Sequence, residues 1–259
     1  MVDDDMDEVK SFPEGMIPLG DAVFSFRCHP GVSCFTVCCR KVDLRLYPYD
    51  VLRLKNALGM DSEAFMRIHT RIVRDENPFF PTVMLAMTEE GQGSCPFLAD
   101  SGCTIYAHRP SDCRSYPLER AVDRRPEARG ARDHYFLVRH AYCKGHEEPE
   151  VINARQYIRS QQLEQYNTFN ELWAEMDTIF RNNPWQGEGA GGPRQQLAFM
   201  ICYNIDGFRQ LVAERKLIEQ FRLPKDRKRG ILERDEELLK FGFDWLKLIL
   251  TGKSSLIKR

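Results

Sequence analysis

The chain carries nine cysteines, and eight of them lie between Cys28 and Cys143. Cysteines that act only as small hydrophobic core residues would be scattered along the whole chain. Thiolates are ligands of zinc and of iron–sulfur clusters, so a cluster of cysteines predicts a metal centre. Cys202 stands apart within an apolar, helical pattern, and we expect it to pack in the core.

The first group of cysteines is closely spaced, at Cys28, Cys34, Cys38 and Cys39. Cys34 and Cys38 are four residues apart, which places both sulfurs on one face of a helical turn. Pro30-Gly31 predicts a turn that directs Cys28 back toward the same point. Adjacent side chains diverge, so one member of the Cys38–Cys39 pair is expected to serve a second site or to support the first.

The second group consists of widely spaced cysteines in a stretch rich in glycine and proline. Its members are Cys95, Cys103, Cys113 and Cys143. Turns allow thiolates to converge without helix or strand geometry. Four basic residues adjoin the cysteines in sequence and could offset thiolate charge or donate hydrogen bonds to sulfur: Arg40, Lys41, Arg109 and Arg114. Solvated surface side chains are the alternative.

The compartment suggested by the sequence is reducing. A signal peptide begins with a basic segment that is followed by an apolar one, whereas the first eight residues of this chain are acidic. We therefore expect no export signal, and the predicted location is cytoplasmic. No apolar run approaches the ~18 residues of a membrane span. Structural disulfides are therefore not favoured.

The cysteines and the residues around them resemble the YkgJ-type cysteine-cluster family. The resemblance covers about residues 24–145 and includes Cys95-Pro96-Phe97-Leu98, Gly102-Cys103-Thr104-Ile105-Tyr106 and Arg109-Pro110-x-x-Cys113-Arg114. It implies a zinc- or iron-chelating domain, often described as containing an iron–sulfur cluster, and a likeness to flagellin lysine N-methylase. The family's usual spacing is Cys-x2-Cys-x2-Cys-Cys, so the wider gaps here leave the role of Cys28 the least defined.

The spacing of the cysteines favours an iron–sulfur cluster over zinc. Structural zinc sites usually draw on two short cysteine knuckles, and the second group forms no such knuckle. Iron–sulfur clusters accept ligands from irregular loops. The resemblance implies 4Fe-4S as the cluster type, with zinc as the alternative. The first choice of ligands is Cys34, Cys38, Cys95, Cys103, Cys113 and Cys143, followed by Cys28 and Cys39. His29 and His108 are expected to be polar loop residues.

The predicted fold is α+β, with 42% hydrophobic and 29% charged residues, as in an ordinary globular protein. We expect an acidic tail over 1–20, a loop-rich cysteine-cluster metal domain with short strands and helices over 21–147, and a helical region over 148–259. The cysteine domain would pack against about three long C-terminal helices, near 152–180, 194–221 and 232–250. Residues 42–46, 82–87 and 134–139 alternate or are apolar as in strands, and helices are expected near 50–58 and 61–69.

Three C-terminal motifs have ordinary interpretations. Gly187–Gly192 follows no predicted strand and is expected to be a linker rather than a phosphate loop. Lys225–Arg229 is expected to be a solvated basic run. Tyr203, Asn204, Asp206 and Arg209 resemble residues of longer family members, and they predict either a cleft facing the metal region or a buried hydrogen-bond network.

The sequence thus predicts a metal-binding protein that holds an iron–sulfur cluster or zinc and takes part in redox or electron transfer. One alternative is an S-adenosylmethionine-dependent protein lysine N-methyltransferase-like enzyme, although the Cys-x3-Cys-x2-Cys triplet of radical enzymes is missing. Another is a zinc-stapled interaction module. Catalytic residues are not identified, and a protein redox partner or protein substrate stays open. The net charge of -1 gives no reason to expect nucleic acid or a membrane.

Overall fold

The computed structural model describes residues 17–40, 42–74, 77–88, 93–123 and 132–259. Lys41 and most of the predicted acidic tail lie outside these ranges. The chain forms two compact units, each made of two separate segments: unit 1 comprises Met1–Cys34 and Ser115–Gln161, and unit 2 comprises Phe35–Arg114 and Gln162–Arg259. The predicted sequence domains, divided at residue 147, stay a prediction.

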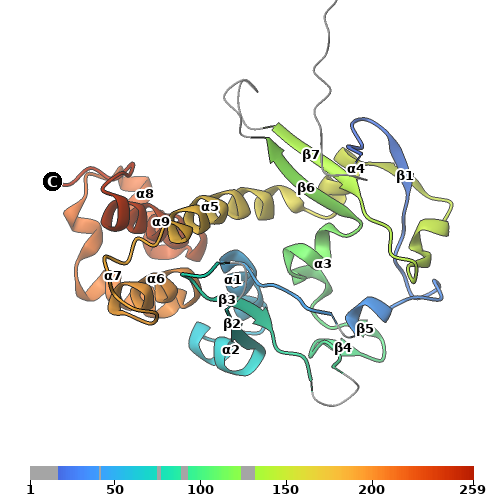
Figure 1. The fold of residues 1–259 in the computed structure, drawn as a ribbon, viewed down its shortest axis with the longest axis horizontal. Coiled ribbons are helices and arrows are strands. Elements are labelled where there is room, and N and C mark those ends of the chain that lie inside the picture. The colour runs from blue at the N-terminus through green and yellow to red at the C-terminus, as the bar shows by residue number, and fades with distance from the viewer. Residues whose placement is uncertain (1–16, 41, 75–76, 89–92, 124–131) are drawn as a thin grey trace, which may run out of the picture. The chain divides into compact units, whose positions relative to one another are not determined.

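Unit 1 is built on two antiparallel strand pairs (Figure 1). Strand β1 (Val23–Ser25) pairs with β8 (Val151–Asn153), and β6 (Leu118–Asp123) pairs with β7 (Arg132–Leu137). Helix α4 (Ala154–Ser160) follows β8 and begins with a capping box formed by Asn153 and Gln156. Phe24, Leu118, Ala154 and Tyr157 make the small apolar core of this unit.

Unit 2 begins with short elements around the cysteines. They are the 3₁₀ turn η1 (Val37–Cys39), α1 (Pro48–Ala57), α2 (Ser62–His69), the strand pair β2 (Thr70–Val73) and β3 (Thr82–Leu85), the strand pair β4 (Leu98–Ala99) and β5 (Gly102–Cys103), the 3₁₀ turn η3 (Tyr106–His108) and α3 (Ser111–Ser115). The predicted strand over 42–46 is reduced to Leu44–Leu46, which exchanges two backbone hydrogen bonds with β3.

The C-terminal part of unit 2 is helical, as predicted. It contains α5 (Leu163–Arg181), α6 (Pro193–Tyr203), α7 (Ile205–Glu214), the 3₁₀ turn η6 (Leu217–Gln220), α8 (Lys225–Glu233) and α9 (Asp235–Thr251). The fold is α+β, which confirms the predicted class. None of the helices among the described residues has the length and apolar character needed to cross a membrane.

Two of the three long predicted helices, near 152–180 and 194–221, are divided, whereas the third, near 232–250, is observed as α9. Gln162 has a left-handed backbone (φ 53°) and separates α4 from α5. Asn204 leaves helical geometry, and its side chain accepts a hydrogen bond from Gly207 N at 2.8 Å, which starts α7. Arg234 is extended between α8 and α9. Apolar periodicity continues across the breaks at Gln162 and Asn204, because both helices of each pair bury an apolar face.

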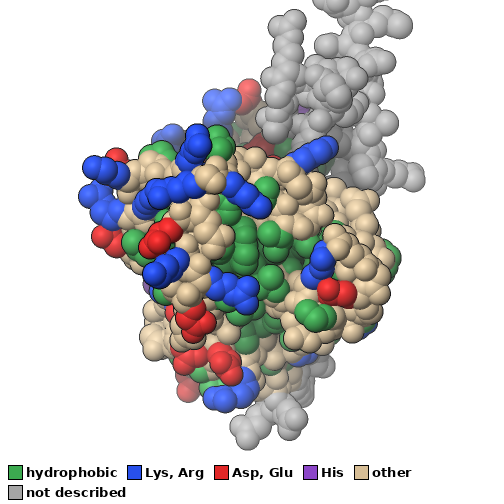
Figure 2. Space-filling model, turned by 90° about the vertical axis from the view of Figure 1, so that its left-hand side faces the viewer, with side chains coloured by type: hydrophobic (Ala, Val, Ile, Leu, Met, Phe, Trp, Pro, Cys, Tyr) green, Lys and Arg blue, Asp and Glu red, His purple; other side chains and the backbone are tan. Residues whose placement is uncertain are grey.

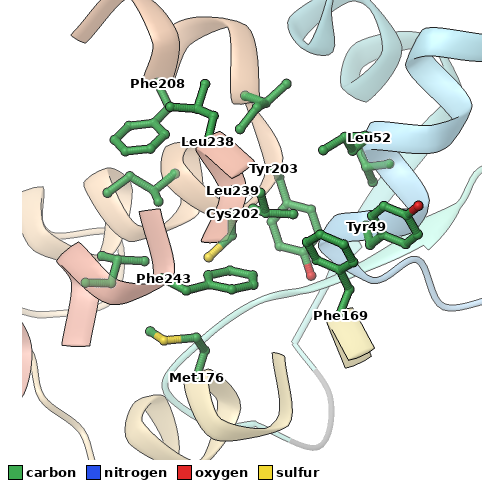
Figure 3. Close-up of a cluster of buried hydrophobic side chains, with 14 of the residues drawn as sticks. Tyr49, Leu52, Phe169, Met176, Cys202, Tyr203, Phe208, Leu238, Leu239 and Phe243 are labelled. Atoms are coloured by element: carbon green, nitrogen blue, oxygen red, sulfur yellow. The ribbon is translucent and has the colours of Figure 1, made fainter. Parts of the chain in front are cut away.

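The main core of unit 2 joins α1 to the C-terminal helices (Figure 3). Tyr49 and Leu52 come from α1, Phe169 and Met176 from α5, and Leu239 from α9. Cys202, from α6, lies in the same core and is 3% exposed, which confirms its predicted packing role. Burying a large side chain stabilises the fold by about 1.5–3 kcal/mol, so this core holds α1 firmly against the helices.

The basic run Lys225–Arg229 lies within α8 rather than in a loop. Arg227 pairs with Asp244 at 2.6 Å, and Arg229 pairs with Asp226 at 3.3 Å. Figure 2 shows the surrounding surface, on which Lys and Arg side chains lie beside an apolar patch. Two cations of the run are thus matched by carboxylates of the same unit.

Candidate metal centre

Unit 2 contains five of the eight predicted metal ligands: Cys38, Cys39, Cys95, Cys103 and Cys113. Thr36 takes a left-handed backbone (φ 66°) and starts the η1 turn that carries Cys38 and Cys39. Cys95 N donates to Cys39 O at 2.8 Å, and Arg40 and Ser94 form an antiparallel bridge next to this bond. Residues 56 positions apart in the chain are thereby held side by side.

The β4–β5 hairpin brings Cys103 to the same region. Leu98 pairs with Cys103, and Ala99 pairs with Gly102. Gly102 has φ 113°, a conformation available essentially to glycine alone, and a Cβ atom there would lie 3.0 Å from Cζ of Phe35. The Phe35 ring thus packs directly over the hairpin, so within unit 2 the segment that leads into Cys38 and Cys39 is fixed against the hairpin that carries Cys103.

Cys113 lies on the short helix α3, which Asp50 holds in place. The Asp50 carboxylate accepts hydrogen bonds from Ser111 N (2.8 Å), Ser111 Oγ (3.1 Å) and Tyr47 N (3.0 Å). Asp50 is completely buried, and burial raises its pKa to about 7, with the nearby Asp112 adding to the increase. The sequence marked Asp50 only as a helix start, and no local signal pointed to its contact with Ser111.

The pKa values of four thiols show that they influence one another. A hydrogen bond donated by the Cys39 thiol lowers the pKa of Cys38 to about 7. The same hydrogen bond raises the pKa of Cys39, because the donor must keep its proton. Burial and the charges of Cys38, Cys95 and Cys113 raise the pKa of Cys39 further. Burial, and then the charges of Cys103 and Cys38, raise the pKa of Cys95. Burial and Cys95 raise the pKa of Cys113. These sulfurs therefore occupy one electrostatic environment.

The basic residues beside the cysteines have different roles. Arg109 lowers the pKa of both Cys38 and Cys113, so its charge reaches the thiols, and it lies over the Tyr106 ring at 3.7 Å. Arg114 donates to the carbonyls of Ala107 (2.5 Å) and Arg109 (3.4 Å). Arg40 donates to Ser94 Oγ at 3.0 Å. Among the basic residues that the structure describes, Arg109 is therefore the cation whose charge lowers the pKa of these thiols.

Unit 1 contains the other three predicted ligands, Cys28, Cys34 and Cys143. The backbone nitrogen of Lys144 donates to Cys34 Sγ at 3.0 Å, so Cys34 lies beside the residue that follows Cys143. The Tyr116 hydroxyl donates to the Cys143 sulfur, a bond that raises the pKa of Tyr116 after the larger effect of burial.

Backbone contacts hold the segment before Cys28 in the same part of unit 1. Arg27 N donates to Gly145 O at 3.0 Å, and a Cβ atom on Gly145 would lie 2.8 Å from Arg27 O. Cys28 itself is exposed. The three cysteines of unit 1 thus lie on two segments that run close together.

All nine cysteines are free thiols, so the disulfide alternative is not the state of this structure. Within the described residues, no three Cys, His, Asp or Glu side chains already stand in a metal-holding arrangement. The five cysteines of unit 2 are a donor set of soft sulfurs near the Arg109 cation, which suits zinc or an iron–sulfur cluster. Binding would require the thiol side chains to reorient.

The two histidines beside the cysteines make local polar contacts. His29 Nε2 lies 3.0 Å from Glu148 Oε2, and His108 Nδ1 lies 3.1 Å from Arg53 Nη2. Burial, and then Arg53 and Arg114, lower the pKa of His108. Both contacts fit the predicted role of polar loop residues.

The C-terminal motif Tyr203, Asn204, Asp206 and Arg209 belongs to a hydrogen-bond network. Asp206 accepts bonds from Ser62 N and Oγ, both at 2.7 Å, and from Lys55 Nζ at 3.1 Å. Arg209 pairs with Asp235 at 2.6 Å. These contacts join α7 to α1, α2 and α9, so the network alternative describes the motif.

Comparison with known proteins finds one family model that matches part of the chain. Residues 27–144 match the CxxCxxCC family model, described as a putative zinc- or iron-chelating domain. This stretch contains all eight of the clustered cysteines. Neither the curated proteins nor the solved structures include a match to this chain.

Proposed function

From the match of residues 27–144 to the CxxCxxCC family of zinc- or iron-chelating domains, we propose that the protein holds an iron–sulfur cluster through its clustered cysteines. The observation that carries the proposal is the shared environment of Cys38, Cys39, Cys95 and Cys113, whose pKa values depend on one another. A metal centre replaces thiol protons and relieves the mutual repulsion of thiolates.

The ligand set of unit 2 supports iron–sulfur chemistry over zinc alone. Its sulfurs come from a 3₁₀ turn, a loop, a hairpin strand and a short helix rather than from two knuckles. We propose Cys38, Cys95, Cys103 and Cys113 as the first ligands to test, with Cys39 beside Cys38. Cys28, Cys34 and Cys143 of unit 1 are the remaining proposed ligands.

Each surrounding residue has a definite part in this proposal. A bound cluster would supply one-electron chemistry. Arg109 would offset the negative charge of the thiolates and so favour the reduced state of the centre. Asp50 would hold α3, and with it Cys113, in position.

Anaerobic purification followed by metal and sulfide analysis tests the proposal. A brown protein containing iron and acid-labile sulfide supports a cluster. A colourless protein containing only zinc supports the zinc-stapled module instead. A protein that binds neither metal under reducing conditions would contradict both.

The methyltransferase alternative and the cellular setting also stay proposals. Calorimetric titration with S-adenosylmethionine tests the first, because an electron-transfer module has no reason to bind this compound. The cytoplasmic location, a protein redox partner or substrate, and the lack of a nucleic-acid ligand remain predictions of the sequence.

A further inference from the structure

The last part of the chain differs from the rest in charge. Residues 215–259, which follow α7, contain 13 Lys and Arg against 7 Asp and Glu, a net charge of +6. The remaining residues contain 24 Lys and Arg against 31 Asp and Glu, a net charge of -7, so the nearly neutral total conceals this difference. Such an asymmetry is typical of a protein in which one basic surface meets an anionic partner.

Few of the cations in this segment are matched by carboxylates of the protein itself. Four of them form ion pairs, namely Arg227, Arg229, Lys240 and Lys247. The other nine basic residues form no ion pair within the part of the chain that the structure describes, and all of these except Lys228 are exposed. The excess of positive charge is therefore available to a partner.

The end of the chain is ordered, because it lies antiparallel to residues 220–222. A bridge pairs Phe221 with Lys258, and Arg222 N donates to Ile257 O at 2.8 Å. Phe221 is buried in the main core of unit 2, which anchors the two short segments to the helices. The charges at the end of the chain are thus held in place rather than carried on a loose terminus.

An apolar side chain and two cations share the outer face of these paired segments. Side chains alternate between the two faces of an extended segment, so the neighbours of the buried Phe221 point away from the core. Arg222, Ile257 and Arg259 lie on this outer face, and all three are exposed. Ile257 is 63% exposed and lies directly opposite Arg222.

Helix α8 belongs to the same surface, because Asp244 of α9 contacts both α8 and the C-terminal segment. The Asp244 carboxylate accepts a hydrogen bond from Arg227 at 2.6 Å, and its carbonyl accepts one from Ser254 Oγ at 2.7 Å. Leu232 of α8 and Ile249 of α9 are 60% and 39% exposed. Figure 2 shows this end of the molecule, where Lys and Arg side chains border an apolar patch on several sides.

We propose that residues 215–259 form an interaction surface for an acidic amphipathic segment of a partner protein. The carboxylates of such a segment would pair with the unmatched cations, and its apolar side chains would cover the exposed aliphatic residues. The proposal is independent of which metal the cysteines bind, because none of them lies in this segment.

Two features favour a protein segment over other anionic partners. The exposed large apolar residues of this segment are aliphatic, whereas single-stranded nucleic acid is bound through stacking on aromatic rings. Exposed carboxylates also lie among the cations, at Glu219, Asp226 and Glu233. A bilayer or a nucleic-acid backbone presents continuous negative charge and would meet these carboxylates, whereas a peptide can place its own carboxylates opposite the cations only.

Fluorescence anisotropy with labelled peptides and the full-length, anaerobically purified protein tests the proposal. The probe is a peptide of about 18 residues, with leucines at helical spacing and glutamates at most other positions. A second peptide replaces Glu by Gln, and a third replaces Leu by Ser. The acidic leucine peptide should bind, and the other two should bind at least about tenfold more weakly. Raising NaCl from about 50 to about 300 mM should also weaken binding, because salt screens exposed charges.

Substitutions on the outer face of the paired segments locate the binding. Arg222→Glu and Arg259→Glu reverse exposed charges, Ile257→Ser removes the exposed apolar side chain, and each should weaken binding by about fivefold or more. Arg67→Glu on α2 and Ile72→Ser on β2 are matched controls at exposed positions of the same unit and should bind normally. All five variants should keep the wild-type melting temperature and metal content, because the altered side chains are exposed.

Three outcomes would overturn the proposal. The first is that the acidic leucine peptide does not bind, or that the Gln peptide binds equally well. The second is that the control variants lose as much affinity as the variants of the C-terminal surface. The third is that a uridine oligonucleotide or phosphatidylserine vesicles bind more tightly than the peptide and lose binding in the same variants. That result would assign the surface to nucleic acid or to lipid.

Discussion

The carboxylate of Asp50 accepts two hydrogen bonds from Ser111, one from its backbone nitrogen and one from its hydroxyl. Asp50 lies on α1, which the main core of unit 2 holds in place, and Ser111 begins the helix that carries Cys113. A buried polar contact between residues 61 positions apart therefore decides where one proposed metal ligand lies.

Replacing Asp50 by Ala should lower both stability and metal content. The change leaves Ser111 N, Ser111 Oγ and Tyr47 N without their acceptor, and we expect a loss of about 2–4 kcal/mol in the free energy of unfolding. Urea denaturation measures the loss of stability, and metal analysis of the purified variant shows whether Cys113 still binds the metal. Asp61→Ala is the control, since it removes a helix cap at an exposed site. It should cost about 1 kcal/mol and leave the metal unchanged. Equal metal loss in both variants would contradict the role of Asp50.

Asp50 should also give stability a distinct dependence on pH. Its pKa is raised to about 7 in the folded protein from an ordinary value of 3.8, so the folded state binds the proton more tightly than the unfolded state. The contribution of Asp50 to stability is therefore greatest below about pH 4 and is lost as the pH rises to about 7. Denaturation curves between pH 5 and pH 8 should show this decline in the wild-type protein. Asn at position 50 cannot titrate, so the stability of Asp50→Asn should fall less between pH 5 and pH 8 than that of the wild-type protein. An equal fall in stability in both proteins would contradict the raised pKa of Asp50.

Lys55 should be one of the most sensitive positions outside the cysteines. It is 5% exposed and lies 3.1 Å from Asp206 and 3.3 Å from Asp235. Lys55→Met leaves both carboxylates without this cation, and we expect a loss of about 3 kcal/mol in the free energy of unfolding. Arg229→Met removes an exposed pair with Asp226 and should change stability by about 0.5 kcal/mol or less. Similar losses in the two variants would show that the Lys55 network adds little.

Cysteine variants should separate metal binding from core packing. Cys113→Ser should lower metal content and melting temperature together, because metal binding contributes to folding. Cys202→Ala should lower the melting temperature through a small cavity while metal content stays constant. Unchanged iron and zinc in Cys113→Ser would remove Cys113 from the proposed ligands.

Gly102→Ala should disturb the contact between the two cysteine groups of unit 2. A Cβ atom there meets Phe35 at 3.0 Å, and φ 113° is unfavourable for alanine. We expect a loss of about 2–3 kcal/mol and reduced metal content. Gly59→Ala is the matched control, because Gly59 also has a positive φ but no atom within 4 Å of its Cβ position. It should cost about 1 kcal/mol with normal metal content.

The sequence alone determined the α+β class, the resemblance to the CxxCxxCC family over residues 27–144, the helical C-terminal part and the packing of Cys202. These features depend on local periodicity and on residue type, which are visible along the chain. The divided helices show the limit of this information, since the apolar pattern near Gln162 and Asn204 continues while the backbone turns.

Only the tertiary structure decided which chemical groups meet. Cys39 lies beside Cys95, Phe35 covers Gly102, and Arg109 rather than Arg114 acts on the thiols. Such pairings depend on contacts between distant segments, and a single sequence specifies the groups that need partners without specifying which partners they find.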